Sequence, residues 1–386
     1  MRFKTDDGDD FPVWNIKFGN EVFQNISDKN HNSDLPILAI TQDFGAIPRD
    51  LIDYKISVTD KSVESYKVVQ KGDFIISLRS FQGGIEYSDY QGICSPAYII
   101  LRPIITIDNI FYKYYLKTSK YITHLNRKLE GIRDGKMISY KYFSDIVLPI
   151  PSIVEQNKIS SFLSIIEARI QTQKKIIEDL QITKKIVSVR LFNKGFDNRN
   201  NYNFKKLGDL TYVVNKKNKE NLKLPVYSIN NKKGFVTQSE QFEGVDSDER
   251  GYDISLYKII DKETFAYNPA RINVGSIGYS RSLENIIISS LYVCFKTSDD
   301  VNDEFLFQYL KTDLFKKDVL RNVEGGVRDY LFYENFSRIK INLPDTSTQN
   351  KIADFLKLFD EKINLENELL IQYENQKRYL LANLFI

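Results

Sequence analysis

Two loops of related sequence carry side chains that could bind a flat polar partner through paired hydrogen bonds. The first loop, SLRSFQGG, holds Arg79 and Gln82, and the second, PARINVG, holds Arg271 and Asn273. Arginine offers a rigid fork of N–H groups, and an amide offers a donor beside an acceptor, so both side-chain types can form paired hydrogen bonds with base edges. A phosphate contact or a solvated turn remains an alternative for each arginine.

A second group of basic residues recurs in a repeated tight turn. EGIRDGK (130–136) contains Arg133 and Lys136, and EGGVRDY (324–330) contains Arg328. Each arginine is followed by an aspartate, Asp134 or Asp329, so a local ion pair explains these arginines as well as binding to an external group does.

The sequence offers little support for catalysis. It contains only two histidines, His31 and His124, and none of the patterns GxxxxGK[ST], GxGxxG, CxxC or HExxH. Its acidic residues form no set spaced for metal-assisted hydrolysis. Cys94 and Cys294 lie in apolar runs, which is typical of core residues. We therefore expect no catalytic residue, no metal site and no cofactor bound by this chain.

One tetrapeptide needs separate treatment. NPAR (268–271) superficially resembles the Asn-Pro-Pro-aromatic signature of amino-methyltransferases. The second proline and the aromatic residue are missing, and no glycine-rich cofactor loop precedes the tetrapeptide. A turn before a strand is the simpler interpretation, although a fused or cryptic methyltransferase remains the enzymatic alternative.

The element that must position these loops is a long helix following Pro151. Ser152 and Glu155 form a capping-box pattern, and neither proline nor glycine follows until Gly195. Apolar residues recur at alternating steps of four and three, which predicts a coiled-coil seam. The seam positions are 159, 163, 166, 170, 173, 177, 180, 184, 187 and 191, and the polar ones are Gln173 and Lys184.

A second helix repeats this pattern 193 residues later. Its seam again has two polar breaks, Glu366 and Lys377, at the positions that match Gln173 and Lys184. QNKI at 156–159 recurs at 349–352. Asp345, or Thr346 with Gln349, can cap this helix although Thr348 replaces the acidic residue. The agreement indicates an internal duplication.

The regions before the two helices are also related to each other. LPILAITQDFGAI (35–47) matches LPVYSINNKKGFV (224–236), and FSDIVLPIP (143–151) matches FSRIKINLP (336–344). Short β-rich runs separated by glycine turns fill residues 66–103, a strand or turn is expected near the start, and 109–130 has helical spacing. A final strand within 140–151 should run into the long helix.

These patterns predict an α+β chain with a pseudo-twofold internal repeat. Two similar α/β domains, 1–151 and 196–344, are each followed by a long helix, 152–195 and 345–386. The short linker after residue 195 places the second domain near the end of the first helix, which favours an antiparallel coiled coil. The two cysteines and the absence of an 18-residue apolar run favour a reduced cytoplasm and no membrane association.

The assembled pattern resembles the specificity (S) subunit of type I restriction–modification enzymes. The resemblance rests on GDFIISLRSFQGGIEYSDYQGICSPAYIILRP (72–103), on YNPARINVGSIG (267–278), and on F-x-x-I-x-L-P-x-P-x-x-x-E-Q-x-x-I-x-x-x-L starting at Phe143. It spans the full chain, and its most specific element is the alternation of two recognition regions with two helical regions. Thr348 departs from the pattern.

The resemblance implies two target-recognition domains that each read half of a split sequence in double-stranded DNA. It implies that the helices act as a spacer and bind two modification (M) subunits, which carry the S-adenosylmethionine chemistry, while restriction (R) subunits complete a bacterial complex. The S subunit itself has no catalytic activity. Independently, two related but divergent domains suit a two-part asymmetric target. The candidate DNA-binding residues are Arg79, Gln82, Arg133, Lys136, Arg271, Asn273 and Arg328.

Apolar residues outside the seam are candidates for binding the M subunits. They are Phe162, Ile165, Ile176, Ile186, Phe355, Leu358, Leu369 and Ile371. Packing against the chain's own recognition domains is the alternative for these residues. A third class of function, a structural spacer protein that lacks DNA binding, also remains open at this stage.

Overall fold

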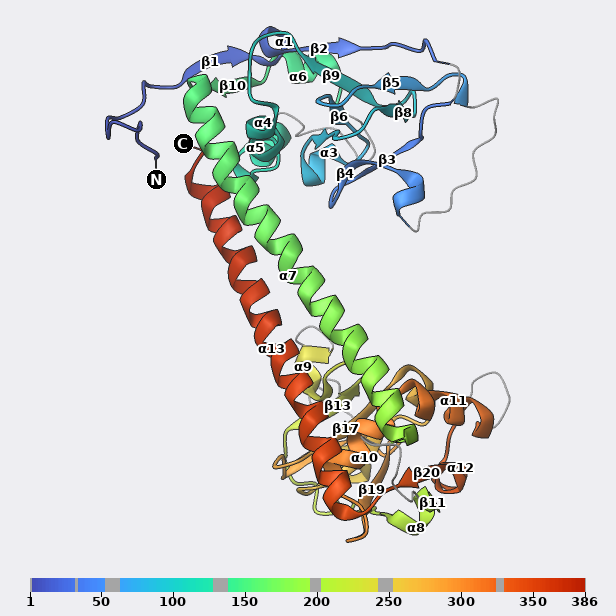
Figure 1. The fold of residues 1–386 in the computed structure, drawn as a ribbon. Helices are drawn as coiled ribbons and strands as arrows, with labels where there is room; N and C mark the ends of the chain where they lie inside the picture. Colours follow the sequence, from blue (N-terminus) through green and yellow to red (C-terminus); the bar gives the residue numbers. More distant parts are fainter. Residues whose placement is uncertain are drawn as a thin grey trace. The chain divides into compact units, whose positions relative to one another are not determined.

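A computed structural model describes residues 2–31, 34–52, 63–127, 138–194, 203–241, 253–323 and 330–385. The chain divides into two compact units (Figure 1). The first unit combines Met1–Lys174 with Leu369–Ile386, and the second is Lys175–Glu368. Each unit therefore contains one mixed α/β domain together with part of both long helices. The predicted α+β architecture is confirmed.

The domain of the first unit is built on an antiparallel sheet in the order β2-β9-β6-β7. These strands are β2 (Phe23–Ile26), β9 (Ile99–Pro103), β6 (Phe74–Ile76) and β7 (Glu86–Tyr87). Two smaller antiparallel pairs join β3 (Leu38–Thr41) to β4 (Gly45–Pro48) and β5 (Lys67–Val69) to β8 (Gly92–Cys94). The strands are short because glycine and polar turns interrupt the apolar runs.

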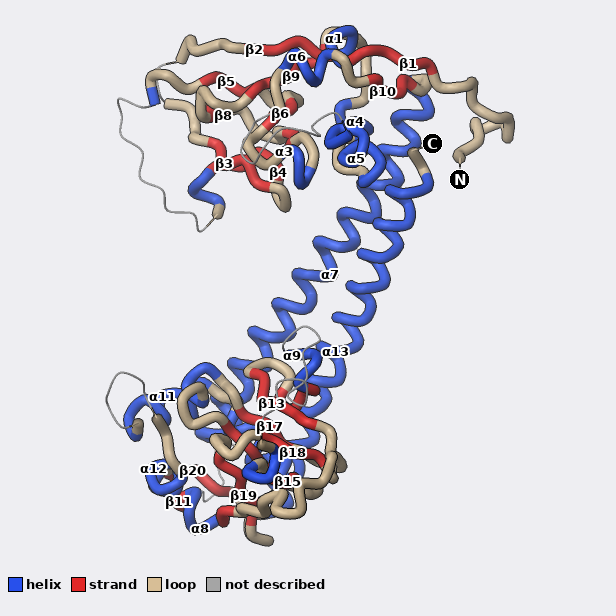
Figure 2. The backbone as a smooth tube through the Cα atoms, turned by 180° about the vertical axis from the view of Figure 1, so that it is seen from behind, coloured by secondary structure: helices blue, strands red, loops and turns tan. Residues whose placement is uncertain are grey.

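The first domain also contains several short helices between and after its strands. They are α1 (Gly19–Val22), η1 (Arg49–Leu51), α3 (Ser80–Gly83), α4 (Asn109–Tyr115), α5 (Ser119–Arg127) and α6 (Tyr140–Ser144). Within 109–127, the described part of the stretch with helical spacing, the chain forms two helices, and the Thr118 hydroxyl accepts a hydrogen bond from the Tyr121 N–H (3.2 Å) at the start of the second. Figure 2 shows α4 and α5 between the sheet and the long helices.

The second unit repeats this order of elements. Its first sheet is β12-β19-β16-β17, formed by β12 (Thr211–Val213), β19 (Val293–Thr297), β16 (Phe265–Tyr267) and β17 (Ile277–Tyr279). Its second sheet is β14-β13-β18-β15, formed by β14 (Gly234–Thr237), β13 (Val226–Asn230), β18 (Ile286–Ile288) and β15 (Lys258–Ile260). The helices are α8 (Leu207–Leu210), α9 (Gln238–Gln241), η3 (Ile254–Leu256), η4 (Ile272–Val274), α10 (Asp303–Leu310), α11 (Asp313–Asn322) and α12 (Tyr333–Arg338).

The strand expected at the start of the chain is confirmed and leads into the first long helix by pairing. β1 (Asn15–Phe18) is antiparallel to β10 (Val147–Ile150), which directly precedes α7 (Ile153–Lys194). The second unit has the equivalent pair, β11 (Asn203–Lys206) with β20 (Lys340–Leu343), before α13 (Thr346–Asn383). A two-stranded ribbon thus fixes the beginning of each long helix to its own domain.

The seam positions predicted for α7 and α13 are all buried or half-buried. Within the first unit, Leu163 of α7 and Leu380 of α13 join the core of the domain. Within the second unit, Leu191 of α7 and Leu356 of α13 do the same. In each unit the beginning of one helix therefore packs with the end of the other, as antiparallel pairing requires.

Aromatic residues at the helix ends complete both domain cores. Phe385, just after α13, lies 5.2 Å (ring centroids) from Phe111 of the first domain. Phe192, near the end of α7, lies 5.1 Å from Phe305 of the second. The members of each pair are separated by 193 or 194 residues from their counterparts, so the duplication extends to the packing of the core.

The capping box predicted at Ser152 is only half correct. The Ser152 hydroxyl accepts a hydrogen bond from the Glu155 N–H at 3.3 Å, as expected. The Glu155 carboxylate, however, is fully buried and binds Arg2 (2.9 and 3.0 Å) and the Trp14 indole N–H (2.9 Å) instead of the cap backbone. A cationic and a neutral donor from the N-terminal segment outcompete one exposed backbone N–H.

At the second helix, Asp345 is the cap. Its carboxylate accepts a hydrogen bond from the Thr348 N–H at 2.8 Å, and this backbone hydrogen bond lowers the pKa of Asp345. The cap therefore does not require an acidic residue at position 348.

Candidate nucleic-acid interface

Arg79 lies three residues after the end of strand β6 and immediately before the single turn of helix α3. The Ser77 hydroxyl accepts a hydrogen bond from the Arg79 N–H at 3.2 Å, and Gly84, with φ of +82°, closes the loop. Arg79 and Gln82 are both exposed. Neither side chain has a hydrogen-bond or ion-pair partner within the described part of the chain, so the guanidinium and the amide are available to a ligand.

Arg271 occupies the same place in the second unit, immediately before η4. The Asn268 side chain accepts a hydrogen bond from the Ala270 N–H at 3.0 Å, and Gly275, with φ of +91°, closes this loop. Arg271 is exposed and Asn273 is half-buried. Among the residues that the structure describes, no partner contacts the Arg271 guanidinium. The two loops therefore present one arginine each from matching backbone frames.

We name residues 77–84 and 268–275 the arginine loops. The remaining candidates, Arg133, Lys136 and Arg328, lie outside the described residues and stay predictions. Whether any of the candidates contacts DNA is likewise still a prediction.

The turn of the β3–β4 hairpin is a neighbour that the sequence interpretation did not identify as part of a site. Its residues 42–44 are exposed, and Gln42 donates a hydrogen bond to the Arg79 carbonyl at 3.4 Å. In the second unit the β13–β14 turn, residues 231–233, is also exposed. The signal in the sequence was the pair TQDFG and NNKKG, in which the glycine is kept and the turn residues differ.

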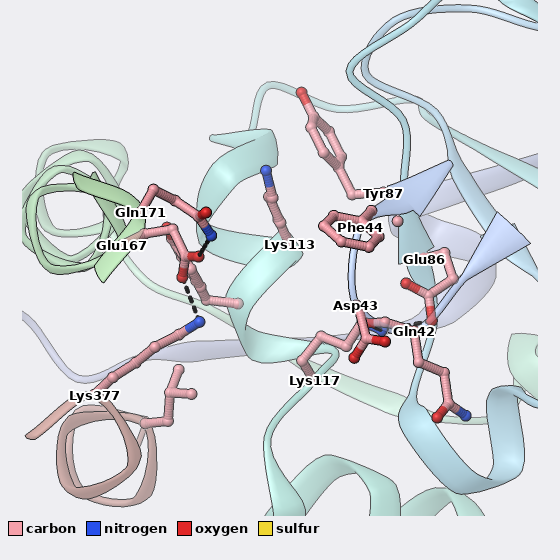
Figure 3. A pocket seen from close by; sticks show the side chains of 13 residues that line it. Gln42, Asp43, Phe44, Glu86, Tyr87, Lys113, Lys117, Glu167, Gln171 and Lys377 are labelled. Atoms are coloured by element: carbon pink, nitrogen blue, oxygen red, sulfur yellow. Dashed lines mark hydrogen bonds and ion pairs between the residues drawn. The ribbon is translucent and has the colours of Figure 1, made fainter. Parts of the chain in front are cut away.

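A cavity of about 390 Å³ lies in the first unit beside this hairpin turn (Figure 3). Its lining includes three lysines, but each of them is already paired. Lys113 contacts Asp89 at 3.0 Å, Lys117 contacts Glu86 at 2.5 Å, and Lys377 forms an ion pair with Glu167. These pairs neutralise the cavity, so it shows no excess of positive charge that would attract an anion.

Ion pairs join α7 to α13 at the polar breaks of the seam. In the second unit the Lys184 ammonium lies 2.6 Å from Asp360, and in the first unit Lys377 pairs with Glu167. Lys377 follows Lys184 by the repeat distance of 193 residues, and Asp360 follows Glu167 by the same distance, so the two pairs correspond with the helices exchanged. The breaks thus serve as complementary contacts between the helices.

The electrostatics of these pairs explain their ionisation. Burial alone would raise the pKa of Asp360, but attraction by Lys184 and hydrogen bonds from Lys184 and Gln308 outweigh burial and lower it. Burial likewise acts against ionisation of Glu167, and hydrogen bonds from Lys377 and Gln171 lower its pKa. Both carboxylates are therefore held in the charged form.

Two corresponding glutamines connect the domains to the helices. Gln156 accepts a hydrogen bond from the Asp108 N–H (2.9 Å) and donates to the Pro151 carbonyl (2.9 Å). Gln349 accepts from the Asn302 N–H (2.8 Å) and donates to the Pro344 carbonyl (2.9 Å). Both side chains are buried. The repeated QNKI motif thus has a structural role that the sequence alone did not reveal.

The apolar candidates for partner binding differ in their exposure. Ile165 (56%), Ile186 (64%), Leu358 (61%) and Ile371 (56%) are the most exposed, while Ile176 and Phe355 are each 39% exposed. Leu369 is half-buried. Phe162 packs edge-on against Phe3 with 5.5 Å between ring centroids, and it touches the core of its own domain. Partner binding by this group is still a prediction.

The remaining titratable groups do not form a reactive centre within the described residues. Burial raises the pKa of the Cys94 thiol to about 12 and that of Cys294 to about 11, so both stay protonated at neutral pH. No cluster of three or more His, Cys, Asp or Glu in the described ranges could hold a metal ion. No described helix is both long and apolar enough to cross a membrane.

The chain has two related α/β domains and two long paired helices, and each domain presents one exposed arginine loop. This arrangement is typical of a protein that recognises a target in two parts. Comparison with known proteins identifies the family. The family model of the type I restriction modification DNA specificity domain matches twice, over residues 4–181 and 199–375. The chain belongs to this family and is a DNA-specificity protein of type I restriction–modification systems.

Individual relatives agree with this assignment. The MjaVIII type I restriction enzyme specificity subunit of Methanocaldococcus jannaschii is 24% identical over 350 residues, which cover 84% of this chain and 80% of the relative. The HindI specificity subunit of Haemophilus influenzae is 26% identical over 135 residues, which cover 33% of this chain and 29% of the relative. Because an archaeon is among the relatives, a bacterial source stays a prediction.

Solved structures support the fold. A chain from a study of complex assembly and conformational transition of the type I R-M system matches with a TM-score of 0.59 at 14% identity, over 97% of this chain and 98% of that one. The S subunit of a type I system from M. genitalium matches with a TM-score of 0.54 at 15% identity, over 100% of this chain and 99% of that one.

Proposed function

We propose that this chain is the non-catalytic subunit that reads a bipartite target in double-stranded DNA, one half-site for each domain. The observation that carries this proposal is the placement of Arg79 and Arg271. Both follow a core strand, both precede a single helical turn, and both are exposed. Arginine at such a position can bind the O6 and N7 atoms of guanine through two hydrogen bonds.

The divergence between the two arginine loops supports different half-sites. Gln82 follows Arg79 at a distance of three residues, whereas Asn273 follows Arg271 at two. An amide of either kind can pair with adenine, but its reach and direction differ. Two domains with one frame and different loop residues would read two different short sequences.

The partners proposed for the chain are two M subunits and, in the full complex, R subunits. Internal pseudo-symmetry supports two M subunits, because a repeated surface offers the same contacts twice. The exposed residues Ile165 and Leu358 are separated by 193 residues, so they form one such repeated pair. S-adenosylmethionine would be bound by the M subunits, and the assembly would act on DNA in the cytoplasm.

The proposed absence of catalysis is supported by the sequence, which lacks the motifs of a methyltransferase or of a nucleotide-dependent enzyme. The buried state of Cys94 and Cys294 also argues against nucleophilic catalysis by either thiol.

Methyl transfer from labelled S-adenosylmethionine to DNA tests the proposal. We expect no transfer by the purified chain alone, and sequence-specific transfer when it is assembled with its M subunits. Mapping of the methylated sites should show two constant half-sites separated by a gap. Transfer by the chain alone would identify it as an enzyme, and methylation without sequence preference would identify it as a scaffold that does not read DNA.

A further inference from the structure

The hairpin turn and the arginine loop contact each other in both units. In the first unit the Gln42 side chain donates a hydrogen bond to the Arg79 carbonyl at 3.4 Å. In the second unit a Cβ atom added to Gly275 would lie 3.5 Å from the Asn231 carbonyl oxygen, so this turn also lies against its arginine loop. Each turn is exposed, and each lies against its arginine loop. A ligand bound by the arginine would therefore meet the turn as well.

Behind the turn of the first unit lies an ion pair between Glu86 and Lys117 (Figure 3). The Glu86 side chain is 2% exposed, and its Oε1 atom is 2.5 Å from the Lys117 ammonium. The same ammonium donates a hydrogen bond to the Gln42 carbonyl at 3.3 Å. Lys117 therefore connects the edge strand β7 to the backbone of the hairpin turn.

The second unit has no carboxylate at the position that corresponds to Glu86. The sequence IEYS (85–88) matches IGYS (277–280), so Gly278 takes the place of Glu86. The matching hairpin residues are Ala46 and Phe235. A Cβ atom added to Gly278 would lie 2.9 Å from the Phe235 ring, which shows that this ring fills the space above the glycine.

The lysine is present in both units, but its surroundings differ. LKT at 116–118 corresponds to LKT at 310–312, so Lys311 matches Lys117. The Lys311 ammonium lies 4.1 Å from the centroid of the Phe307 ring. A buried carboxylate with a small neighbour in one unit has thus been exchanged for a glycine with a large aromatic neighbour in the other.

We propose that Glu86 and Lys117 are positioning residues for base recognition by the first domain, because they set the place of the hairpin turn relative to the arginine loop. The Phe235 and Gly278 pair does the same for the second domain. The inference rests on the function proposed above. It extends the reading surface from the arginine loops to the turns, whose residues are QDF at 42–44 and NKK at 231–233.

The cost of the charged arrangement supports a role in positioning. Removing a carboxylate from water is unfavourable, and well-packed apolar residues commonly replace a buried ion pair without loss of stability. The second unit shows that the fold accepts such a replacement. The charged version adds a hydrogen bond to the Gln42 carbonyl, and base recognition depends on loop position at the level of a fraction of an ångström.

Variants in the assembled methyltransferase complex test this inference. Glu86→Gly removes the carboxylate and leaves a gap. The double variant Ala46→Phe with Glu86→Gly places a phenylalanine ring above a glycine, as Phe235 lies above Gly278 in the second unit. The measured quantity is the ratio of methylation rates on DNA with the correct half-site and on DNA with one substituted base pair. Each half-site is measured separately, and the one that responds to Arg79→Ala belongs to the first domain.

We expect Glu86→Gly to lower the ratio about tenfold at the half-site of the first domain and to leave the other half-site unchanged, since tenfold corresponds to the weaker base contacts. The double variant should recover the ratio to within about threefold of the original protein. Asp10→Asn, which breaks an exposed ion pair with Lys4 in the same domain, is the control and should change neither half-site.

Two results would overturn the inference. One is an unchanged ratio at the first half-site in Glu86→Gly, and the other is an equal loss at both half-sites, which would indicate a general loss of folded protein. If the unmodified complex methylates DNA without sequence preference, the proposed function fails, and this outcome is distinct because it precedes any substitution.

Discussion

The two domains share one sheet and differ in the strands around it. In the second unit β13 pairs in parallel with β18, which joins four strands into a continuous second sheet. The corresponding strands of the first unit form two separate pairs, joined through a single bridge between Ile37 and Ile93. The part next to the helices has been kept, and the outer part, which carries the turns, has changed.

The domains also differ in how they fill one buried position of the shared sheet. Arg102 binds Asp73 through two hydrogen bonds of 2.8 and 2.7 Å in the first unit. Lys296 and Thr264 replace these residues in the second, and the Thr264 N–H donates to the Ser280 hydroxyl at 2.9 Å. Equivalent frames thus tolerate either a buried charge pair or neutral hydrogen bonds.

The largest effect that separates the domains should come from Arg102→Ala. It leaves the Asp73 carboxylate, which is 1% exposed, without its cation, and we expect a loss of about 3 kcal/mol in the free energy of unfolding of the first domain. Lys296→Ala, the matched control, should cost less than about 0.5 kcal/mol. Denaturant unfolding monitored by hydrogen exchange in each domain measures both. Similar losses in the two variants would show that the ion pair between Arg102 and Asp73 stabilises its domain no more than Lys296 stabilises the other.

Arg79→Ala and Arg271→Ala should each weaken specific DNA binding by the assembled complex by about 1–3 kcal/mol, the worth of one paired base contact. Each substitution should relax specificity in one half-site only. Binding assays against DNA altered in either half-site distinguish this result from a uniform loss, which would reassign the arginines to phosphate contacts.

Gln156→Ala and Gln349→Ala should behave alike, because the two glutamines make the same pair of backbone hydrogen bonds. Each variant leaves a half-buried N–H and a buried carbonyl without a partner, so we expect a loss of about 1–2 kcal/mol in the free energy of unfolding. Thermal unfolding of both variants checks the equality. A cost confined to one of them would mean that the repeated junction is equivalent in sequence only.

The smallest effects should come from the ion pairs between the helices. Lys184→Ala and Lys377→Ala should each cost about 1 kcal/mol at neutral pH, because partial exposure screens these pairs. The folded-state pKa values of Asp360 and Glu167 are lowered, so their stabilisation is present above the ordinary values of 3.8 and 4.5 and is lost as the pH falls below them. The difference between each variant and the original protein should therefore shrink on acidification. A difference that stays constant down to pH 3 would contradict this origin.

Much of the scaffold could be predicted because it repeats. The seam positions of both helices, their shared polar breaks and the strand before each helix follow from periodicity, and burial confirms them. The capping role of Glu155 could not be predicted correctly, because its partners Arg2 and Trp14 are more than 140 residues away in the sequence. For the candidate site, the sequence predicted only arginines and nearby polar residues in glycine-rich loops. Three of its basic residues lie outside the described part of the chain.

The duplication, the order of domains and helices, and the antiparallel pairing could all be predicted from the amino-acid sequence, because local periodicity and repeat distances carry this information. The contacts between residues far apart in the chain follow from the folded structure alone. It brought Lys184 to Asp360, Lys117 to both Glu86 and Gln42, and the Phe235 ring to the space above Gly278. Such contacts depend on the packing of distant segments, which residue spacing does not encode. The contact between each hairpin turn and its arginine loop could therefore be identified only from the folded structure.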